Sequence, residues 1–158
     1  MHRKRIASVV LLLAVIAGCA GLEHLQTPDI ERGRSLVKSM GCNDCHTPGY
    51  QERGPEIPEQ DWLTGGTLGF FGPEGTSYPV NLRLLCDRIS EDDWLVLARQ
   101  MRKDAPMGAI LLPRTPEADL RAIYHFVKHL GPKGDPAPAS LPAGVTPPTP
   151  YIEFPYLH

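Results

Sequence analysis

The feature that most constrains this chain is the run Cys42-Asn43-Asp44-Cys45-His46, a C-x-x-C-H motif. This spacing is typical of c-type haem attachment: the two thiols add to the haem vinyl groups as thioethers, and the histidine directly after the second cysteine reaches the iron. A thioredoxin-like dithiol would need a βαβ pattern around the motif, and none is visible. A zinc site would need a second pair of soft ligands, which Cys86 alone does not supply. We therefore expect one haem c, bound covalently through Cys42 and Cys45 with His46 as an iron ligand.

Length and composition exclude several classes of protein. A chain of 158 residues corresponds to one domain, or to two small ones. Its 42% hydrophobic content argues against a disordered protein, and its 22% charged content argues against a strongly basic nucleic-acid binder. The 17 prolines and 15 glycines are many for a helical domain, so we expect long loops or an extended tail to contain them.

The N-terminus has the pattern of a targeting signal. Basic residues in segment 1–5 precede an apolar stretch over 6–17, which is shorter than the ~20 residues a membrane span needs but fits a signal peptide. Ile16-Ala17-Gly18-Cys19 resembles the lipobox of bacterial lipoproteins, which implies a signal peptide over 1–18, lipid on Cys19 and a lipidated tether over 19–27. The alternative is an ordinary secreted protein cleaved near Gly18. Either way we expect export, and the lipoprotein reading places the chain on the periplasmic side of a bacterial membrane.

Export changes the charge of the chain. Removal of residues 1–18 takes away three of the 16 basic side chains and none of the 18 acidic ones, so the net charge falls from −2 to −5. A mildly acidic domain does not favour nucleic acid or an anionic membrane surface as its main partner. The expected contact with the membrane is the lipid on Cys19.

Caps and periodicity predict three main helices. The first has Thr27 as its N-cap and Pro28 at its first position, the second begins at Ser90, and the third has Thr115 as its N-cap and ends at Gly131-Pro132. Their apolar faces repeat every three or four residues. The faces are formed by Gly33, Leu36, Val37 and Met40; by Trp94, Leu97, Ala98 and Met101; and by Leu120, Ile123, Tyr124, Val127 and Leu130.

No segment alternates clearly enough to predict a strand, so the expected fold is all-α. Residues 49–80 are rich in glycine and proline and read as one long loop. Such a loop would normally count against a fold assignment, but it can wrap a large apolar ligand in place of a protein core. The segment 132–158 is a proline-rich extension that either packs back on the domain or docks on a partner.

Residues 28–131 resemble the monohaem class I cytochrome c family, and most closely the cytochromes that serve bacterial periplasmic dehydrogenases and oxidases. The resemblance implies a fold of three main helices with loops wrapping one haem, and a crossing of the first and last helices at Gly33 opposite Tyr124. The motifs that carry it are Arg32-Gly33-Arg34-Ser35-Leu36-Val37, Gly41-Cys42-Asn43-Asp44-Cys45-His46-Thr47-Pro48, Leu63-Thr64-Gly65-Gly66, Tyr78-Pro79-Val80-Asn81, Pro106-Met107 and Asp119-Leu120-Arg121-Ala122-Ile123-Tyr124.

The resemblance also implies roles for residues around the iron. His46 is the proximal ligand, and its second ring nitrogen donates to the carbonyl of Pro55 or, failing that, Pro58. Met107 is the distal ligand, presented from the loop before the last helix; Met101, a histidine or an open site are the alternatives. The residues placed by resemblance at the haem propionates are Trp62, Tyr78, Asn81 and Arg83.

Three remaining residues have structural interpretations. His125 and His129 lie one turn apart, but on the face opposite the apolar one, which favours solvated surface over a metal site. Cys86 is expected to be a buried, inert thiol.

These expectations combine into a function. With His46 and Met107 on the iron both axial positions are filled, so the chain is expected to carry single electrons rather than act as an enzyme. Its partners would be redox proteins at the membrane, a dehydrogenase-type donor and an oxidase or reductase acceptor, with this chain either a free shuttle or the cytochrome subunit of a complex. The alternative is a haem-based sensor or small-ligand binder with an open sixth iron site.

Overall fold

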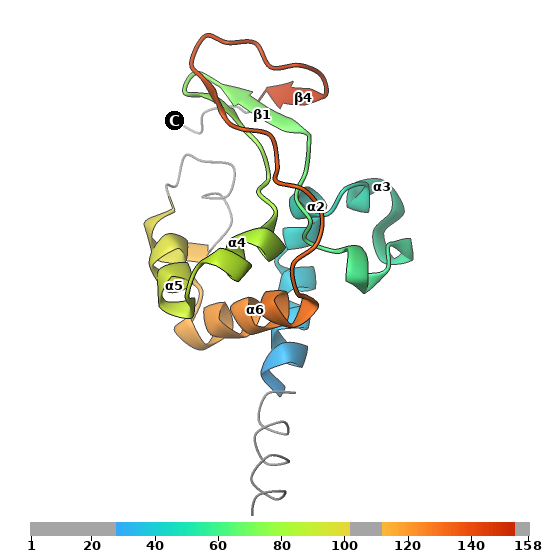
Figure 1. Cartoon of the computed structure of the whole chain (residues 1–158), viewed down its shortest axis with the longest axis vertical. Coiled ribbons are helices and arrows are strands. Elements are labelled where there is room, and N and C mark those ends of the chain that lie inside the picture. The colour runs from blue at the N-terminus through green and yellow to red at the C-terminus, as the bar shows by residue number, and fades with distance from the viewer. Residues whose placement is uncertain (1–27, 102–111, 154–158) are drawn as a thin grey trace, which may run out of the picture.

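The computed structural model describes residues 28–101 and 112–153, which form a mainly helical domain with a small sheet at one end (Figure 1). The first described helix covers residues 28–39. The longer helices that follow are α4 (Leu82–Arg88), α5 (Glu91–Gln100) and α6 (Glu117–Leu130), and the short ones are α2 (Cys42–His46), α3 (Tyr50–Arg53), η1 (Gly54–Glu56), η2 (Glu59–Asp61) and η4 (Leu112–Arg114).

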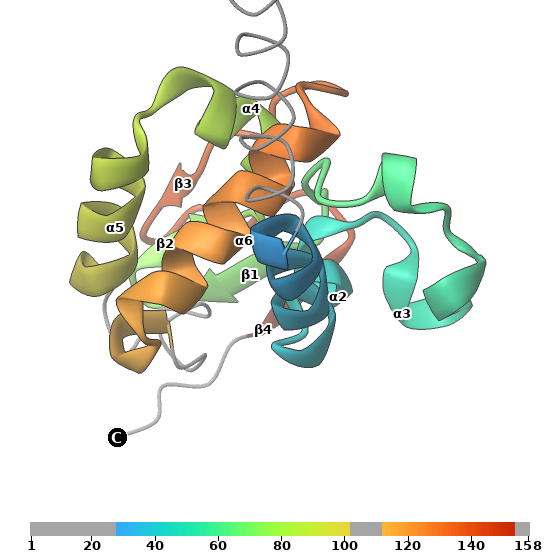
Figure 2. The ribbon, with the colours of Figure 1, turned by 90° about the horizontal axis from the view of Figure 1, so that it is seen from below.

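The helix 28–39 crosses α6, as Figure 2 shows from below, and Gly33 lies at the contact between them. A Cβ on Gly33 would lie 2.0 Å from the carbonyl oxygen of Ala122 and 2.7 Å from Cβ of Phe126. The prediction that Gly33 marks this crossing is confirmed, but the residue opposite it is not Tyr124. Tyr124 points to another neighbour, because its hydroxyl donates to the carbonyl of Ile89 at 3.0 Å.

The caps of the helices agree with the sequence at α5 and differ by one residue at α6. Ser90 caps α5 and forms a capping box with Asp93, as its spacing predicts. The N-cap of α6 is Pro116 rather than Thr115, whose side chain is buried. Helix α6 ends where predicted, at Gly131, whose φ of +69° suits a glycine.

The sheet corrects the expectation of an all-α fold. The strands β1 (Gly69–Gly72), β2 (Gly75–Ser77), β3 (Leu141–Pro142) and β4 (Tyr151–Glu153) form a mixed sheet in the order β3-β2-β1-β4. The pair β1–β2 is an antiparallel hairpin, β3 pairs antiparallel with β2, and β4 pairs parallel with β1. Strands of two to four residues are too short to show alternation, and half of them come from the tail, so the sequence pattern does not reveal them.

The C-terminal extension packs back on the domain. After α6 it runs up to the sheet, where β3 and β4 flank the hairpin (Figure 1). Gly75 makes this possible, because a Cβ there would lie 2.1 Å from the carbonyl oxygen of Leu141. Phe71 and Tyr151 meet edge to face, with ring centroids 5.7 Å apart. Of the two expectations for this tail, packing on the domain is confirmed for residues 132–153.

The apolar core lies between α6, the helix 28–39 and the segment after α2. Phe126 and Leu63 are its largest fully buried side chains, and Trp62 lies 6.4 Å from the Phe126 ring. Cys86 is buried in the same cluster, as predicted. A second cluster joins α5 to α6 through Ala98, Leu112 and Leu120. Leu97, which the periodicity places on the buried face of α5, is instead 38% exposed.

Candidate functional site

Helix α2 holds both cysteines and the histidine of the C-x-x-C-H motif within five residues. Gly41 begins the helix in a left-handed conformation with φ +70°, which a glycine adopts without strain. Cys42 is buried and Cys45 is partly buried, and neither is disulfide-bonded. Two free thiols and one imidazole therefore lie together on one short helix of five residues.

The two thiols are not the activated thiols of a dithiol redox motif. Burial raises the pKa of Cys42 to about 11, and the nearby charge of Asp44 adds to this. Burial followed by the charge of Asp44 also raises the pKa of Cys45. A reactive C-x-x-C motif instead lowers the pKa of its attacking cysteine. Both side chains are thus protonated thiols at neutral pH.

The imidazole of His46 is held in one tautomer. Its Nδ1 lies 2.8 Å from the main-chain oxygen of Val80, and because a carbonyl only accepts, Nδ1 carries the proton. Burial lowers the pKa of His46, with the Val80 hydrogen bond opposing this to a smaller extent, so the ring is neutral at pH 7. The lone pair of the neutral ring is therefore on Nε2.

Nε2 of His46 has the properties of a ligand atom. It is buried, and it has no hydrogen-bond partner among residues 28–101 and 112–153. A buried polar atom left unpaired costs about 1–3 kcal/mol, so such atoms usually have a partner. An Nδ1 fixed by a carbonyl with the second ring nitrogen free to coordinate is the arrangement typical of metal-ligating histidines.

Val80, and not Pro55 or Pro58, supplies the acceptor for His46, which corrects the expectation from resemblance. The chain after α2 turns into α3 and η1, where Pro55 is exposed, and Pro58 is exposed just before η2. The segment 79–82 lies beside His46 instead. The sequence contains one signal for this segment: Val80 directly precedes Asn81, a good N-cap residue, so its carbonyl lies outside the helix that follows.

Two glycines bring the segment 79–82 against α2. Gly65 donates its N–H to the carbonyl of His46 at 2.8 Å, and Gly66 donates to the carbonyl of Pro79 at 2.9 Å. Gly65 has a φ of +93°, and a Cβ there would lie 3.0 Å from the nitrogen of Asn81. A Cβ on Gly66 would lie 2.8 Å from the carbonyl oxygen of Cys45. Residues 65–66 thus join the helix of the motif to the acceptor of its histidine.

A buried polar chain supports the other side of α2. Thr47 donates its hydroxyl to Oδ1 of Asn43 at 2.8 Å and accepts from the N–H of Leu63 at 2.8 Å. Asn43 and Thr47 are 1% and 2% exposed, so these bonds are shielded from water. Leu63 has a φ of +63°. This left-handed conformation costs energy for any residue other than glycine, so the surrounding hydrogen bonds must maintain it.

The proposed propionate donors are engaged elsewhere. The indole of Trp62 donates to the carbonyl of Ile57, and the amide of Asn81 donates to the carbonyls of Lys133 and Asp135. Arg83 donates to the main-chain oxygens of Gln60, Leu130 and Gly131. Tyr78 is buried beside Gly69 of β1. Three of the four side chains therefore stabilise the backbone of this chain, and the role the resemblance implies for them is not supported.

Only some of the candidate distal ligands lie in the part of the chain that the structure describes. Met107 lies outside the described residues, as do Cys19 and the N-terminal segment 1–27. Met101 packs against Ala98, Leu112 and Leu120 and so serves as core filler. In the part of the chain that is described, no three histidine, cysteine or carboxylate side chains are placed to share one metal ion.

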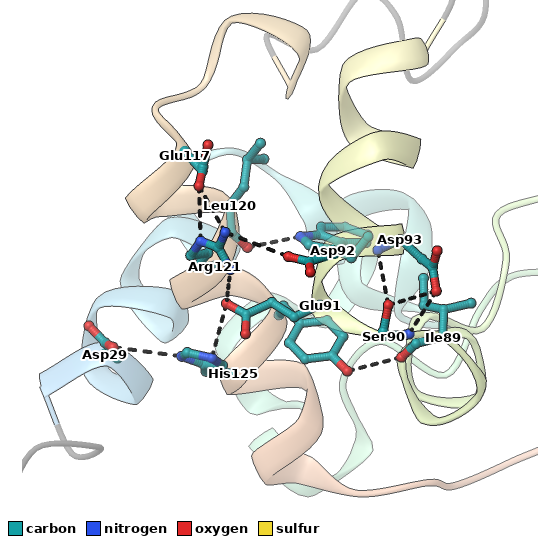
Figure 3. Close-up of polar contacts among 12 residues, drawn as sticks. Asp29, Ile89, Ser90, Glu91, Asp92, Asp93, Glu117, Leu120, Arg121 and His125 are labelled. Carbon is teal, nitrogen blue, oxygen red and sulfur yellow. Dashed lines mark hydrogen bonds and ion pairs between the residues drawn. The ribbon is translucent and has the colours of Figure 1, made fainter.

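The two histidines of α6 belong to the surface, as their position in the helix predicts. His129 is exposed, and His125 is partly exposed between two carboxylates. Its Nε2 lies 3.3 Å from Glu91, and its Nδ1 lies 3.6 Å from Asp29 (Figure 3). Arg121 meets the same carboxylate of Glu91 at 2.9 Å and links it to Glu117. Arg121 thus ties α5 to α6 by ion pairs, and the ring of His125 lies between α5 and the helix 28–39.

Comparison with protein-family models, curated proteins and solved structures found no match to this chain. Within residues 28–101 and 112–153, no helix is both long and apolar enough to cross a membrane.

Proposed function

We propose that this chain is a one-electron carrier that holds a single c-type haem. Cys42 and Cys45 would form its two thioether bonds, and Nε2 of His46 would be its proximal iron ligand. One observation carries the proposal: Nε2 of His46 is buried and has no hydrogen-bond partner in the described part of the chain. It belongs to the residue next to the free thiol of Cys45, and the free thiol of Cys42 lies in the same short helix. When bound, the haem supplies an iron that alternates between ferrous and ferric states.

The residues present fit this group better than the alternatives. A zinc site would need further donors close to Cys42 and Cys45, and within the described ranges no such set is assembled. A redox dithiol would need a lowered thiol pKa, whereas both are raised here. The crossing of the helix 28–39 with α6 at Gly33, followed directly by the C-x-x-C-H helix, supports a class I cytochrome c arrangement with the sheet as an addition.

The chain's own groups would set the properties of the carrier. Val80 keeps Nδ1 of His46 protonated and increases the electron donation of the ring. Met107 would be the second iron ligand, and a methionine–histidine pair favours the reduced iron. With both ligands bound, no substrate would reach the iron. Lipid on Cys19 would keep the domain near its membrane-associated donor, a dehydrogenase, and its acceptor, an oxidase or reductase.

Optical spectra of the exported chain test the haem and its ligands. In alkaline pyridine, the haem should give the spectrum of a haem whose two vinyl groups have been converted to thioethers. The double variant Cys42→Ser, Cys45→Ser should abolish covalent attachment. We expect a low-spin spectrum that carbon monoxide does not change, and Met107→Ala should make it sensitive to carbon monoxide. Absence of covalent haem would overturn the proposal. A high-spin wild type that binds carbon monoxide would replace the carrier with a haem-based sensor.

The lipid anchor has its own test. Mass spectrometry of the N-terminal peptide should find a diacylated Cys19, and Cys19→Ser should move the protein from the membrane fraction to the soluble periplasmic fraction. An unmodified Cys19 would favour an ordinary secreted carrier.

A further inference from the structure

We propose that Asn81 is a positioning residue for His46, and that the start of the C-terminal extension, residues 133–135, completes the support of the iron ligand. This inference rests on the proposed haem. It begins with the peptide bond between Val80 and Asn81, whose oxygen accepts the Nδ1 proton of His46 at 2.8 Å.

Asn81 holds this peptide from two directions at once. Its Oδ1 accepts from the N–H of Leu84 at 3.1 Å, which fixes the start of α4. Its Nδ2 donates to the carbonyls of Lys133 at 2.8 Å and Asp135 at 3.1 Å, more than fifty residues further along the chain. The side chain is only 4% exposed, so these bonds form away from bulk water. One amide group thus satisfies acceptors and a donor from two separate segments.

The extension is itself fixed where Asn81 binds it. Nζ of Lys133 lies 2.5 Å from Oδ1 of Asp61 and donates to the carbonyl of Gln60 at 3.2 Å. A Cβ on Gly134 would lie 3.4 Å from Nδ2 of Asn81 and 3.4 Å from Cβ of Thr64. The extension therefore rests on the same 60–65 segment that packs against the Asn81 backbone through Gly65.

A continuous set of contacts therefore runs from the extension to the ring of His46. Loss of the Asn81 amide bonds would free the Val80 carbonyl to move and would lengthen its bond to Nδ1. A weaker acceptor makes the histidine a poorer electron donor to a ligated metal. The ferric state would then be less favoured, and the midpoint reduction potential should rise.

The test is the midpoint potential of matched full-chain variants. Asn81→Ser keeps an oxygen that can cap α4 but removes both bonds to the extension, and it should raise the potential. Gln51→Ser makes the same kind of amide-to-hydroxyl change at an exposed position in α3, and it should leave the potential near that of the wild type. Equal potentials for wild type and Asn81→Ser would overturn the inference.

A second pair of variants applies if Asn81→Ser fails to fold. A chain ending at residue 131 lacks both carbonyl acceptors, whereas a chain ending at residue 140 keeps them and loses residues 141–158, which include β3 and β4. The shorter chain should have the higher potential. If both truncations shift the potential equally, the extension acts through the sheet and the inference is wrong.

A haem-independent measurement separates this inference from the proposed function. In the chain before haem attachment, labelled with 15N-histidine, the Nδ1 proton of His46 should exchange with solvent several-fold faster in Asn81→Ser than in the wild type. Unchanged exchange would contradict the role of Asn81. Failure of every variant to attach haem, with exchange still faster in Asn81→Ser, would overturn the proposed carrier and leave the positioning of His46 intact.

Discussion

Gly33 and Ala122 are in backbone contact: a Cβ on residue 33 would lie 2.0 Å from the carbonyl oxygen of Ala122. The helix 28–39 and α6 therefore approach closely, and the absence of a side chain at this position allows their crossing. The crossing places α2, which follows the first helix after a two-residue turn, beside the core that α6 forms.

Gly33→Ala should destabilise the fold. Alanine favours a helix over glycine by about 1 kcal/mol. Overpacking costs about 1–3 kcal/mol or more, and a contact of 2.0 Å leaves no room for adjustment without moving α6. We expect a net loss in the free energy of unfolding, measured in urea. Ser35→Ala, at an exposed position on the same helix, is the control and should be neutral or slightly stabilising. A Gly33→Ala protein as stable as the wild type would contradict the close crossing.

Thr47→Val should weaken the support of the C-x-x-C-H helix. Valine matches threonine in shape but leaves the N–H of Leu63 and Oδ1 of Asn43 without their partner. We expect a loss of about 1–3 kcal/mol in the free energy of unfolding, the cost of unpaired buried polar groups. Thr47→Ser keeps the hydroxyl and should recover most of it. Equal stability of the valine and serine variants would mean that the buried polar chain contributes little.

Arg83→Lys should be destabilising although the charge is kept. The planar guanidinium of Arg83 reaches the carbonyls of Gln60, Leu130 and Gly131, and the residue is 5% exposed. A lysine ammonium cannot reach these three carbonyls with the geometry of the planar guanidinium. We therefore expect a loss of about 1–3 kcal/mol in the free energy of unfolding, measured by urea denaturation. Arg88→Lys, exposed on the same helix, provides the comparison and should change stability little. Similar values for the two variants would show that charge alone is needed at position 83.

Glu91→Gln should reduce the loss of stability in acid. Partial burial raises the pKa of Glu91, but the hydrogen bond to Arg121 and the interactions with His125 outweigh it, so the net pKa lies below its ordinary value of 4.5. A carboxyl with a lowered pKa stabilises the fold above its unfolded pKa, and this contribution disappears as the pH falls through the folded value. Glutamine should cost less than about 1 kcal/mol at pH 7, because the pair is partly exposed, and this cost should shrink as the pH falls below 4.5.

Urea unfolding of Glu91→Gln at pH 7, 5 and 3 measures this contribution. Glu56→Gln, at an exposed position in η1, serves as the reference. A stability difference between Glu91→Gln and the wild type that stays constant down to pH 3 would show that the Glu91 charge is not responsible.

The parts of the fold that depend on neighbours in sequence are predictable from it. The capping box of Ser90 and Asp93 needs residues three apart, and the end of α6 needs only the glycine that follows it. A glycine on an otherwise apolar helical face indicates a close neighbour, and the resemblance implies that this neighbour of Gly33 is the last helix, as the structure confirms. The sequence does not say which residue that neighbour is, and Ala122 replaces Tyr124 for that reason.

The candidate site also has one part that the sequence predicts and another that it does not. The C-x-x-C-H motif places two thiols and an imidazole on one short helix by local geometry alone, and the haem that this motif predicts stays a prediction. The acceptor of His46 is 34 residues away at Val80, the anchors of Asn81 are more than 50 residues away, and β4 pairs with a strand about 80 residues earlier. Helix caps and helical periodicity arise from bonds between close neighbours, so the chain encodes them locally. Hydrogen bonds between distant segments depend on the path of the whole backbone, and only the tertiary structure decides which carbonyl faces His46 and where the extension lies.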